Sequence, residues 1–296
     1  MGSPEFAVPS LRALAKSASI VGVFTQPDRQ AGRGKKVSPP PVKQAAEELG
    51  LPVFQPPRLK GEALDQLRAL APELIVVAAF GQILRSAVLD LPKYGCINVH
   101  ASLLPRWRGA APINAAILHG DSVTGISIMK MDEGIDTGPI LAQKELPIST
   151  GDTAETLALR LAELGAELLT ATLPRYLEGT LQPTPQPEDG ATYIGMLKKD
   201  DGWLDTARPA VQLERQVRAY QPWPGSAILW KGQPLKILRA SVQSGNRPAG
   251  ERLVLDSLPA IGTSEGILLL ESLQPAGKRP MDGNSFLQGA RDWSSH

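Results

Sequence analysis

The first half of the 296-residue chain alternates apolar runs typical of strands with amphipathic patterns typical of helices. ELIVVAAF (73–80) is apolar throughout, as expected for a strand covered on both faces of a sheet. PVKQAAEELG (41–50) begins with proline and ends with glycine, which favour the start and the end of a helix. The other strand-like runs are 20–25, 53–55, 96–100, 125–131 and 139–148, and the other helical patterns are 62–71, 111–119 and 153–179. This alternation predicts an α/β fold with a mostly parallel sheet and helices on both faces.

A proline-rich stretch divides the chain into two parts. QPTPQPEDG (182–190) has three prolines and no apolar side chain, which indicates an exposed linker. After a helical pattern at 209–219, short β-type runs separated by Gly and Pro predict a small β-barrel or sandwich. We therefore predict an α/β domain over 1–180, a linker over 181–200 and a C-terminal β-barrel domain over 201–296.

The composition excludes several classes of protein. The net charge of +1 gives no general attraction for nucleic acid, so an RNA partner would need a local basic patch. The single cysteine, Cys96, excludes a disulfide framework and a cysteine-based zinc site, and its apolar surroundings predict a buried, inert thiol. No run approaches the ~20 apolar residues of a membrane span. The first residues lack the pattern of a signal peptide, so we expect a cytoplasmic protein with no membrane partner.

Asn98 and His100 lie at the end of the strand-like run CINVH. Residues two apart in a strand point the same way, and α/β sheets bind ligands beyond the carboxyl ends of their strands. The loop MDEGIDTGPI (131–140) offers Asp132 and Asp136 as partners for His100. An amide, an imidazole and a carboxylate can together stabilise an oxyanion and move protons. The same residues also occur for structural reasons, since Asp often caps a turn, so residue types alone leave both interpretations open.

Other catalytic arrangements are disfavoured by the sequence. No GxSxG motif is present, which argues against a serine hydrolase. His119 and His296 do not have metal-ligand spacing to His100, so no metal site is expected.

The segment 26–43 is strongly basic, with one acid, Asp28, among its cations. Its Gly and Pro content argues against helix or strand. GRG matches part of a dinucleotide fingerprint, but the third glycine and the following helix are missing. A solvated loop and an RNA contact both remain open from composition. The cations are Arg29, Arg33, Lys35, Lys36 and Lys43.

Several motifs resemble those of the folate-dependent formyltransferases. NVHASLLPRWRGAAPI (98–113) resembles the family signature, in which N-x-H precedes an S-L-L-P loop, and GIDTGPIL (134–141) resembles the block that carries the catalytic Asp. The resemblance covers nearly the whole chain. Further matching stretches are GSPEFAVPS, GVFTQPDRQAGRGKK, AAFGQIL and RAYQPWPG.

The resemblance implies transfer of a formyl group from 10-formyltetrahydrofolate to the α-amino group of methionine on initiator tRNA, for translation initiation, without a metal. Asn98, His100 and Asp136 match the catalytic residues: the first two would reach the oxyanion, and Asp136 would orient His100. A Rossmann-like sheet, an OB-like C-terminal barrel and a monomeric protein are expected. The nearest alternative is formylation of another amine, on glycinamide ribonucleotide or an amino-sugar nucleotide. An RNA-binding protein on a degenerate enzyme scaffold and a nicotinamide oxidoreductase are less well supported.

Carried over residue by residue, the resemblance also implies binding residues. The matches to the folate-contacting segments are Ser102, Leu103, Leu104, Pro105, Phe80, Gly81, Ile83 and Leu84. The expected tRNA contacts of the first domain are Arg29, Arg33, Lys35 and Lys36. In the second domain the candidates are Arg215, Arg218, Lys231, Lys236 and Arg239, although charges on short strands are often only solvated. Trp223 is expected to pack rather than to stack on a base. YIGMLKK departs from the linker pattern of the family.

The opening sequence MGSPEF raises a further expectation. Members of the family begin with a short apolar strand that runs into a Met-Gly pair, so Met1 resembles the last residue of that strand, and the strand itself is expected to be missing. The first strand of a doubly wound sheet is normally central. We therefore expect the neighbouring runs 20–25 and 73–80 either to expose unpaired edges or to collapse together.

Overall fold

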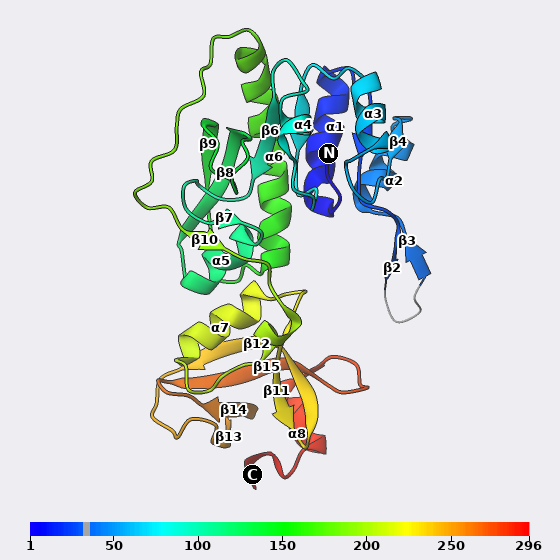
Figure 1. Cartoon of the computed structure of the whole chain (residues 1–296). Coiled ribbons are helices and arrows are strands. Elements are labelled where there is room, and N and C mark those ends of the chain that lie inside the picture. Colours follow the sequence, from blue (N-terminus) through cyan, green and yellow to red (C-terminus); the bar gives the residue numbers. More distant parts are fainter. Residues whose placement is uncertain (32–35, 296) are drawn as a thin grey trace. The chain divides into compact units, whose positions relative to one another are not determined.

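The computed structural model describes residues 1–31 and 36–295, which form two compact units (Figure 1). The first unit comprises Met1–Pro112, Val123–Pro147 and Ala158–Ile194. The second comprises Ile113–Ser122, Ile148–Leu157 and Gly195–His296. Two short segments that lie within the sequence range of the first unit thus belong to the second unit. A division into domains at 180 and 200 stays a prediction.

The strands of the first unit form an α/β arrangement, as the sequence predicts. β5 (Ile75–Val77) pairs in parallel with β6 (Cys96–His100), and β1 (Val23–Phe24) pairs in parallel with β4 (Val53–Phe54). β8 (Val123–Lys130) pairs antiparallel with β6 on one side and with β9 (Ile140–Pro147) on the other. The larger sheet therefore has the order β5-β6-β8-β9 and combines both kinds of pairing.

Four helices, α2, α3, α5 and α6, follow the predicted patterns closely, whereas η1, α1 and α4 were not predicted. α2 (Pro41–Glu48) buries Val42, Ala45 and Ala46, whereas Leu49 lies just beyond it and is exposed. α6 approaches β6 and β8 at Gly165, where a Cβ atom would lie 2.9 Å from Val99 Cγ1. The helices up to residue 177 are η1 (Glu5–Ala7), α1 (Val8–Ser17), α2, α3 (Glu62–Ala69), α4 (Ser86–Leu89), α5 (Pro112–His119) and α6 (Ala154–Leu177).

Met1 and Gly2 lie between β1 and β5, which belong to separate sheets. The backbone N–H of Gly2 donates to Phe24 (3.1 Å), and the N–H of Ala78 donates to Met1 (2.9 Å). Beyond this two-residue bridge lies a cavity of about 870 Å³. Its lining includes the apolar side chains of Leu14, Val23, Leu67, Leu70, Ile75 and Leu173. The runs 20–25 and 73–80 were expected either to expose unpaired edges or to collapse together. The structure shows the first outcome, because β1 and β5 stay in separate sheets.

The basic segment contains a short hairpin, so the expectation that it lacks strands is wrong. β2 (Arg29–Ala31) pairs antiparallel with β3 (Lys36–Ser38), and Figure 1 shows the pair projecting beyond α2. The Gly and Pro residues that argued against strands all lie outside these two triplets. Antiparallel pairing satisfies the backbone N–H and C=O groups of the two triplets, and it does not require strand-favouring side chains.

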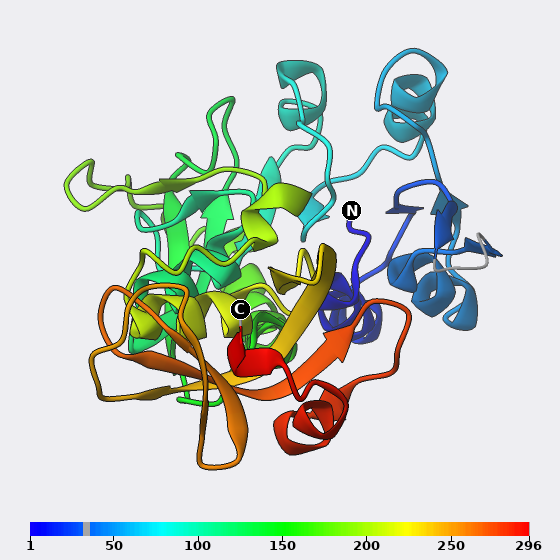
Figure 2. The same ribbon diagram turned by 90° about the horizontal axis from the view of Figure 1, so that it is seen from below.

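The second unit contains a six-stranded antiparallel sheet with a helix-covered core (Figure 2). α7 (Ala210–Ala219) buries Leu213 and Val217 in this core, where Trp230, Phe286 and Trp293 pack together. The strands are β11 (Ser226–Trp230), β12 (Gln233–Gln243), β13 (Arg252–Leu255), β14 (Leu258–Gly262), β15 (Ile267–Pro275) and β16 (Met281–Asp282). The sequence patterns missed β14, β16 and α8 (Gly283–Gly289), although Asp282 caps α8 by accepting from the N–H of Ser285.

The proline-rich segment is exposed but anchored at both ends within the first unit. Thr184 pairs with Ile140, and β10 (Tyr193–Ile194) pairs in parallel with β7 (Arg108–Gly109). Figure 1 shows the segment passing β9 and β8 on its way to β10. η2 (Lys199–Gly202) and η3 (Trp293–Ser295) are short 3-10 turns of the second unit. None of the described helices is long and apolar enough to cross a membrane.

Candidate active site

The end of β6 brings Asn98 and His100 to one carboxylate, that of Asp136. Asn98 Nδ2 donates to Asp136 Oδ1 over 3.2 Å, and His100 Nδ1 lies 3.5 Å from Asp136 Oδ2. Asp136 Oδ2 also accepts the backbone N–H of Gly109 at 2.9 Å. The His100 side chain is 5% exposed and that of Asp136 is 16% exposed, so this cluster is largely shielded from water. The three side chains singled out from the sequence are therefore in mutual contact.

The two Asp candidates of the loop have different surroundings. Asp132 accepts from the N–H of Gly134 and the hydroxyl of Thr137, so its carboxylate caps the turn. Asp136 has a left-handed backbone, with φ of +53°, which is unusual for a residue with a side chain. This conformation turns the carboxylate of Asp136 toward β6. The structure therefore favours Asp136 over Asp132 as the partner of His100.

The second ring nitrogen of His100 is also engaged. Nε2 lies 3.1 Å from the carbonyl oxygen of Trp107, a residue that likewise has positive φ, +60°. Both neighbours of the ring, a carboxylate and a carbonyl, are hydrogen-bond acceptors. Two fixed acceptors define the plane and direction of the imidazole.

A second layer of contacts, which the sequence did not indicate, holds these loops. Gln186 donates from Nε2 to the carbonyl oxygens of Asp136 (2.8 Å) and Gly138 (2.7 Å), and it accepts from Arg108 Nε (3.1 Å). Arg108 is fully buried and also donates to the hydroxyl of Tyr193 (2.8 Å). Gln186 lies in the proline-rich stretch that the sequence indicates as a linker, and only the structure shows what it contacts.

The residues expected to contact folate are divided between buried and exposed positions. The S-L-L-P loop is fixed from within, because Ser102 Oγ donates to Arg106 O and the N–H of Leu104 donates to Ser127 Oγ. Leu103 and Pro105 of this loop are partly exposed. In the other expected segment, Phe80 and Leu84 are buried in the core, whereas Gly81 and Ile83 face solvent. Ile83 is 85% exposed.

Of the residues expected to contact RNA, Arg29 is exposed and donates to Gln26 Oε1 (3.0 Å). Arg33 and Lys35 lie outside the described residues, as does the side chain of Lys36. At the base of the hairpin, Lys43 pairs with Asp28 (2.7 Å). The hydrogen bond from Gln55 and that from Lys43 lower the pKa of Asp28.

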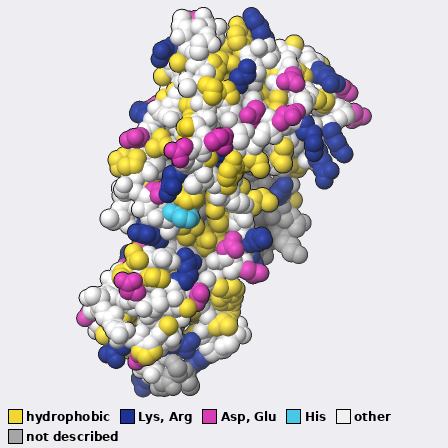
Figure 3. All heavy atoms as spheres, turned by 60° about the vertical axis from the view of Figure 1, so that its left-hand side comes forward, with side chains coloured by type: hydrophobic (Ala, Val, Ile, Leu, Met, Phe, Trp, Pro, Cys, Tyr) yellow, Lys and Arg dark blue, Asp and Glu magenta, His cyan; other side chains and the backbone are white. Residues whose placement is uncertain are grey.

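Several basic candidates of the second unit already have acidic partners. Arg218 pairs with Glu214, Lys231 with Asp292 and Arg239 with Glu271. These contacts weaken their assignment as phosphate ligands. Figure 3 shows Lys and Arg interspersed with Asp and Glu over the face in view. Trp223 is 54% exposed, so the expectation that it packs is wrong.

Two further expectations concern Cys96 and metals. Cys96 is buried, as predicted, and burial raises the pKa of its thiol to about 12. Among the described residues, no group of three or more His, Cys, Asp or Glu side chains is arranged to hold a metal ion.

Comparison with known proteins identifies the family. The family model described as "Formyl transferase" matches residues 2–173, and the model described as "Formyl transferase, C-terminal domain" matches residues 196–291. The chain belongs to the formyltransferase family. The catalytic block expected from the sequence lies inside the first match, and the antiparallel sheet lies inside the second.

Individual relatives of this formyltransferase support the same assignment. It is 52% identical to a methionyl-tRNA formyltransferase of Halorhodospira halophila, over 98% of this chain and 95% of the relative. It is 49% identical to a methionyl-tRNA formyltransferase of Myxococcus xanthus, over 98% and 93%. The fold is similar to that of an N-formyltransferase from Helicobacter canadensis, solved in complex with folinic acid and dTDP-3-aminofucose. The TM-score is 0.68 at 19% identity, over 93% of this chain and 97% of that one.

Proposed function

We propose that this formyltransferase moves a formyl group from 10-formyltetrahydrofolate to the α-amino group of methionine on initiator tRNA. The observation that carries the proposal is the contact of Asn98 and His100 with the single carboxylate of Asp136. The names of the two relatives, both close to 50% identical, support this acceptor over others.

The proposed chemistry uses each side chain differently. The amine nitrogen attacks the formyl carbon, the carbonyl electrons move to oxygen, and the C–N bond to the donor then breaks as the oxygen regains its double bond. Asn98 and His100 donate hydrogen bonds to the oxygen while it carries negative charge, and His100 does so from Nε2, whose N–H is then shared between the oxyanion and the Trp107 carbonyl oxygen. Asp136 holds His100 and assists the departure of the proton that the attacking amine loses. The leaving nitrogen of the donor takes up a proton, so charge and atoms balance. Donors fixed before reaction stabilise such charge without reorganisation.

The surroundings of the cluster fit an aromatic, partly apolar co-substrate. Ile83 and Ile135 are 85% and 62% exposed, and a bound pterin ring would remove such apolar surface from water. Backbone groups of 78–84 and the S-L-L-P loop would hold that ring. The co-substrate supplies the activated formyl group, and no metal is needed for the proposed steps.

The basic segment 26–43 favours a large polyanionic acceptor. Lys and Arg side chains of the segment 26–43 would contact tRNA phosphates, which supply much of the affinity in such complexes. A role in translation initiation places the protein in the cytoplasm. We expect it to act as a monomer.

An acceptor competition tests the proposal. Purified protein is given 10-formyltetrahydrofolate with Met-tRNA, glycinamide ribonucleotide or an amino-sugar nucleotide, and formylated product is measured. We expect product with Met-tRNA only, and none from the Asp136→Asn variant. Preferential formylation of either small acceptor would replace the proposed function by its alternative.

A further inference from the structure

The two groups that hold the His100 ring are themselves held by one segment, residues 184–194, here called the strap. Asp136 lies on one side of the imidazole and the Trp107 carbonyl on the other. On the Asp136 side, Gln186 donates to the Asp136 carbonyl oxygen. On the Trp107 side, the backbone N–H of Trp107 donates to Thr192 Oγ1 over 2.9 Å. The strap therefore contacts both residues that orient the ring.

The two residues that the strap contacts, Asp136 and Trp107, have an unfavourable backbone conformation. Asp136 and Trp107 have φ of +53° and +60°. This left-handed conformation is unfavourable for residues that carry a side chain, so surrounding contacts must hold them in place. The contacts from Gln186 and Thr192 lie directly on their backbone groups.

The orientation of the Gln186 carboxamide follows from its partners. Two carbonyl oxygens, of Asp136 and Gly138, face its nitrogen, and the Arg108 guanidinium faces its oxygen. A flipped amide would place oxygen against oxygen and nitrogen against nitrogen, which removes all three hydrogen bonds. Gln186 thus uses both ends of its side chain.

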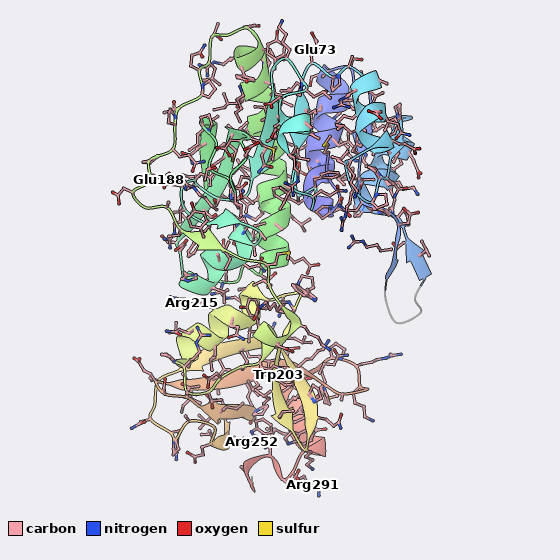
Figure 4. All side chains as sticks on the ribbon, in the orientation of Figure 1. Glu73, Glu188, Trp203, Arg215, Arg252 and Arg291 are labelled. Carbon is pink, nitrogen blue, oxygen red and sulfur yellow. The ribbon has the colours of Figure 1, made fainter. Side chains whose placement is uncertain are left out.

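Arg108 connects Gln186 back to the strap. Its guanidinium has no exposed surface, lies over the Tyr193 ring at 5.6 Å and is 3.5 Å from the carboxylate of Glu188. Glu188, a residue of the strap labelled in Figure 4, is itself 84% exposed. The backbone N–H of Arg108 also donates to Thr192 O (2.9 Å). The strap, the Arg108 loop and the Asp136 loop thereby form one hydrogen-bonded assembly.

We infer that Gln186 and Thr192 are positioning residues for the formyl transfer, acting through Asp136 and Trp107 on the orientation of His100. The expected kinetic effects rest on the proposed function. The dependence of the His100 ring orientation on the strap is independent of that function.

The test compares variants that separate the hydrogen bonds from the fold. Gln186→Ala removes all three side-chain bonds, whereas Gln186→Glu keeps the acceptor for Arg108 and loses the donors to the Asp136 loop. Thr192→Val removes the hydroxyl, and Thr192→Ser keeps it. Gln182→Ala is the matched control, because Gln182 is exposed and its side chain donates only to Gly179 O among the described residues. Thermal midpoints check that each variant is folded.

Kinetics and ring spectroscopy supply two independent readouts. We expect kcat to fall about 10- to 100-fold in Gln186→Ala, Gln186→Glu and Thr192→Val, as for misplaced catalytic groups. KM for both substrates should stay within about three-fold, as for groups that act only in the transition state. The ring ¹⁵N resonances of His100 should move in these variants, while those of His119 stay fixed and provide an internal reference. Thr192→Ser and Gln182→Ala should match the unmodified protein in both readouts.

The possible failures are distinguishable. Unmoved His100 resonances in folded Gln186→Ala and Thr192→Val would overturn the positioning role, and so would unchanged kcat. Full activity of Gln186→Glu would show that the hydrogen bonds from the Gln186 amide nitrogen to the Asp136 loop are not what positions His100. If the unmodified protein does not formylate Met-tRNA, the proposed function fails, while the resonances of His100 still decide the role of the strap.

Discussion

The backbone N–H of Gly109 lies 2.9 Å from Asp136 Oδ2, and this bond joins the loop after His100 to the loop that carries the carboxylate. Gly109 has φ of +116° and passes so close to the strap that an added Cβ atom would meet the Ile194 carbonyl oxygen. The carboxylate of Asp136 is therefore held by a residue that must be glycine, because any side chain at position 109 would displace the neighbouring backbone.

Gly109→Ala is expected to lower activity at least ten-fold and to destabilise the protein by about 1–3 kcal/mol, as overpacking does. Gly195→Ala serves as the control, because nothing lies within 4 Å of the place that its added methyl group would take and its φ is not positive. Thermal unfolding and formylation rates are measured for both. Normal activity of Gly109→Ala would show that the Gly109–Asp136 bond is dispensable.

Replacing each of Asn98, His100 and Asp136 by alanine is expected to slow turnover while leaving folate binding nearly unchanged. The reason is that the proposed contacts of all three are made to charge that develops during reaction. Loss of an oxyanion donor typically costs about 100- to 1000-fold in rate. Single-turnover rates and folate titrations are the measurements. A variant with near-normal turnover would remove that residue from the catalytic set.

The double variant Arg33→Ala/Lys35→Ala is expected to raise KM for Met-tRNA and to flatten its salt dependence. Each lost phosphate contact reduces the slope of log affinity against log salt by about one, so the double variant should lose about two. Arg12→Ala/Lys16→Ala removes the same charge from α1 and provides the control. Equal slopes for both double variants would show that Arg33 and Lys35 do not contact tRNA phosphates.

When the protein is produced with Met1 as its first residue, its stability is expected to rise between pH 6 and pH 8 because of the Met1 amine. Its ammonium donates to Val76 O (2.6 Å), and burial lowers its pKa from 8.0 to about 6. The unfolded chain then binds more protons in this interval, so the free energy of unfolding increases with pH and levels off above pH 8. Two pKa units correspond to at most about 3 kcal/mol.

An acetylated amino terminus isolates this effect, because it removes the titrating group and leaves the histidines in place. Urea unfolding at pH 6, 7 and 8 should show a steeper rise for the free amine than for the acetylated chain. Parallel curves for the two forms would place the amine in water rather than in the interior.

Cys96 is expected to resist alkylation by iodoacetamide in the folded protein at pH 8. Burial raises the pKa of its thiol to about 12, so almost no thiolate forms, and the thiolate is the reactive species. Mass spectrometry should show modification only after denaturant is added. Rapid labelling of the native protein would contradict the buried position.

The sequence predicted most elements of the first unit because their apolar periodicity is strong and local. β6 spans Cys96–His100 as expected, and α2 buries the predicted face. The hairpin β2–β3 was missed, since its pairing depends on backbone hydrogen bonds between two triplets without apolar alternation. β14 was missed because its LPAIG sequence contains proline and glycine, which weaken the pattern of a strand.

The candidate site shows the same limit at the level of side chains. Asn98 and His100 could be found because two-residue spacing at a strand end places them together, and a motif resemblance selected Asp136. Gln186 could not be found, because its three hydrogen bonds join loops that are distant in sequence. Hydrogen-bond partners of this kind follow from the tertiary fold and leave no periodic signal.

The strap also sets the order in which the site can be completed as the chain folds. Gln186 is 50 residues from Asp136 and 78 from Arg108, and Thr192 is 85 residues from Trp107. Contacts across such separations close large loops, whose entropy must be offset before the contacts form. On a ribosome, Asn98, His100 and Asp136 emerge well before residues 184–194. The nascent chain therefore holds its reactive groups for some time without the segment that orients them, and the site matures only when the strap is synthesised.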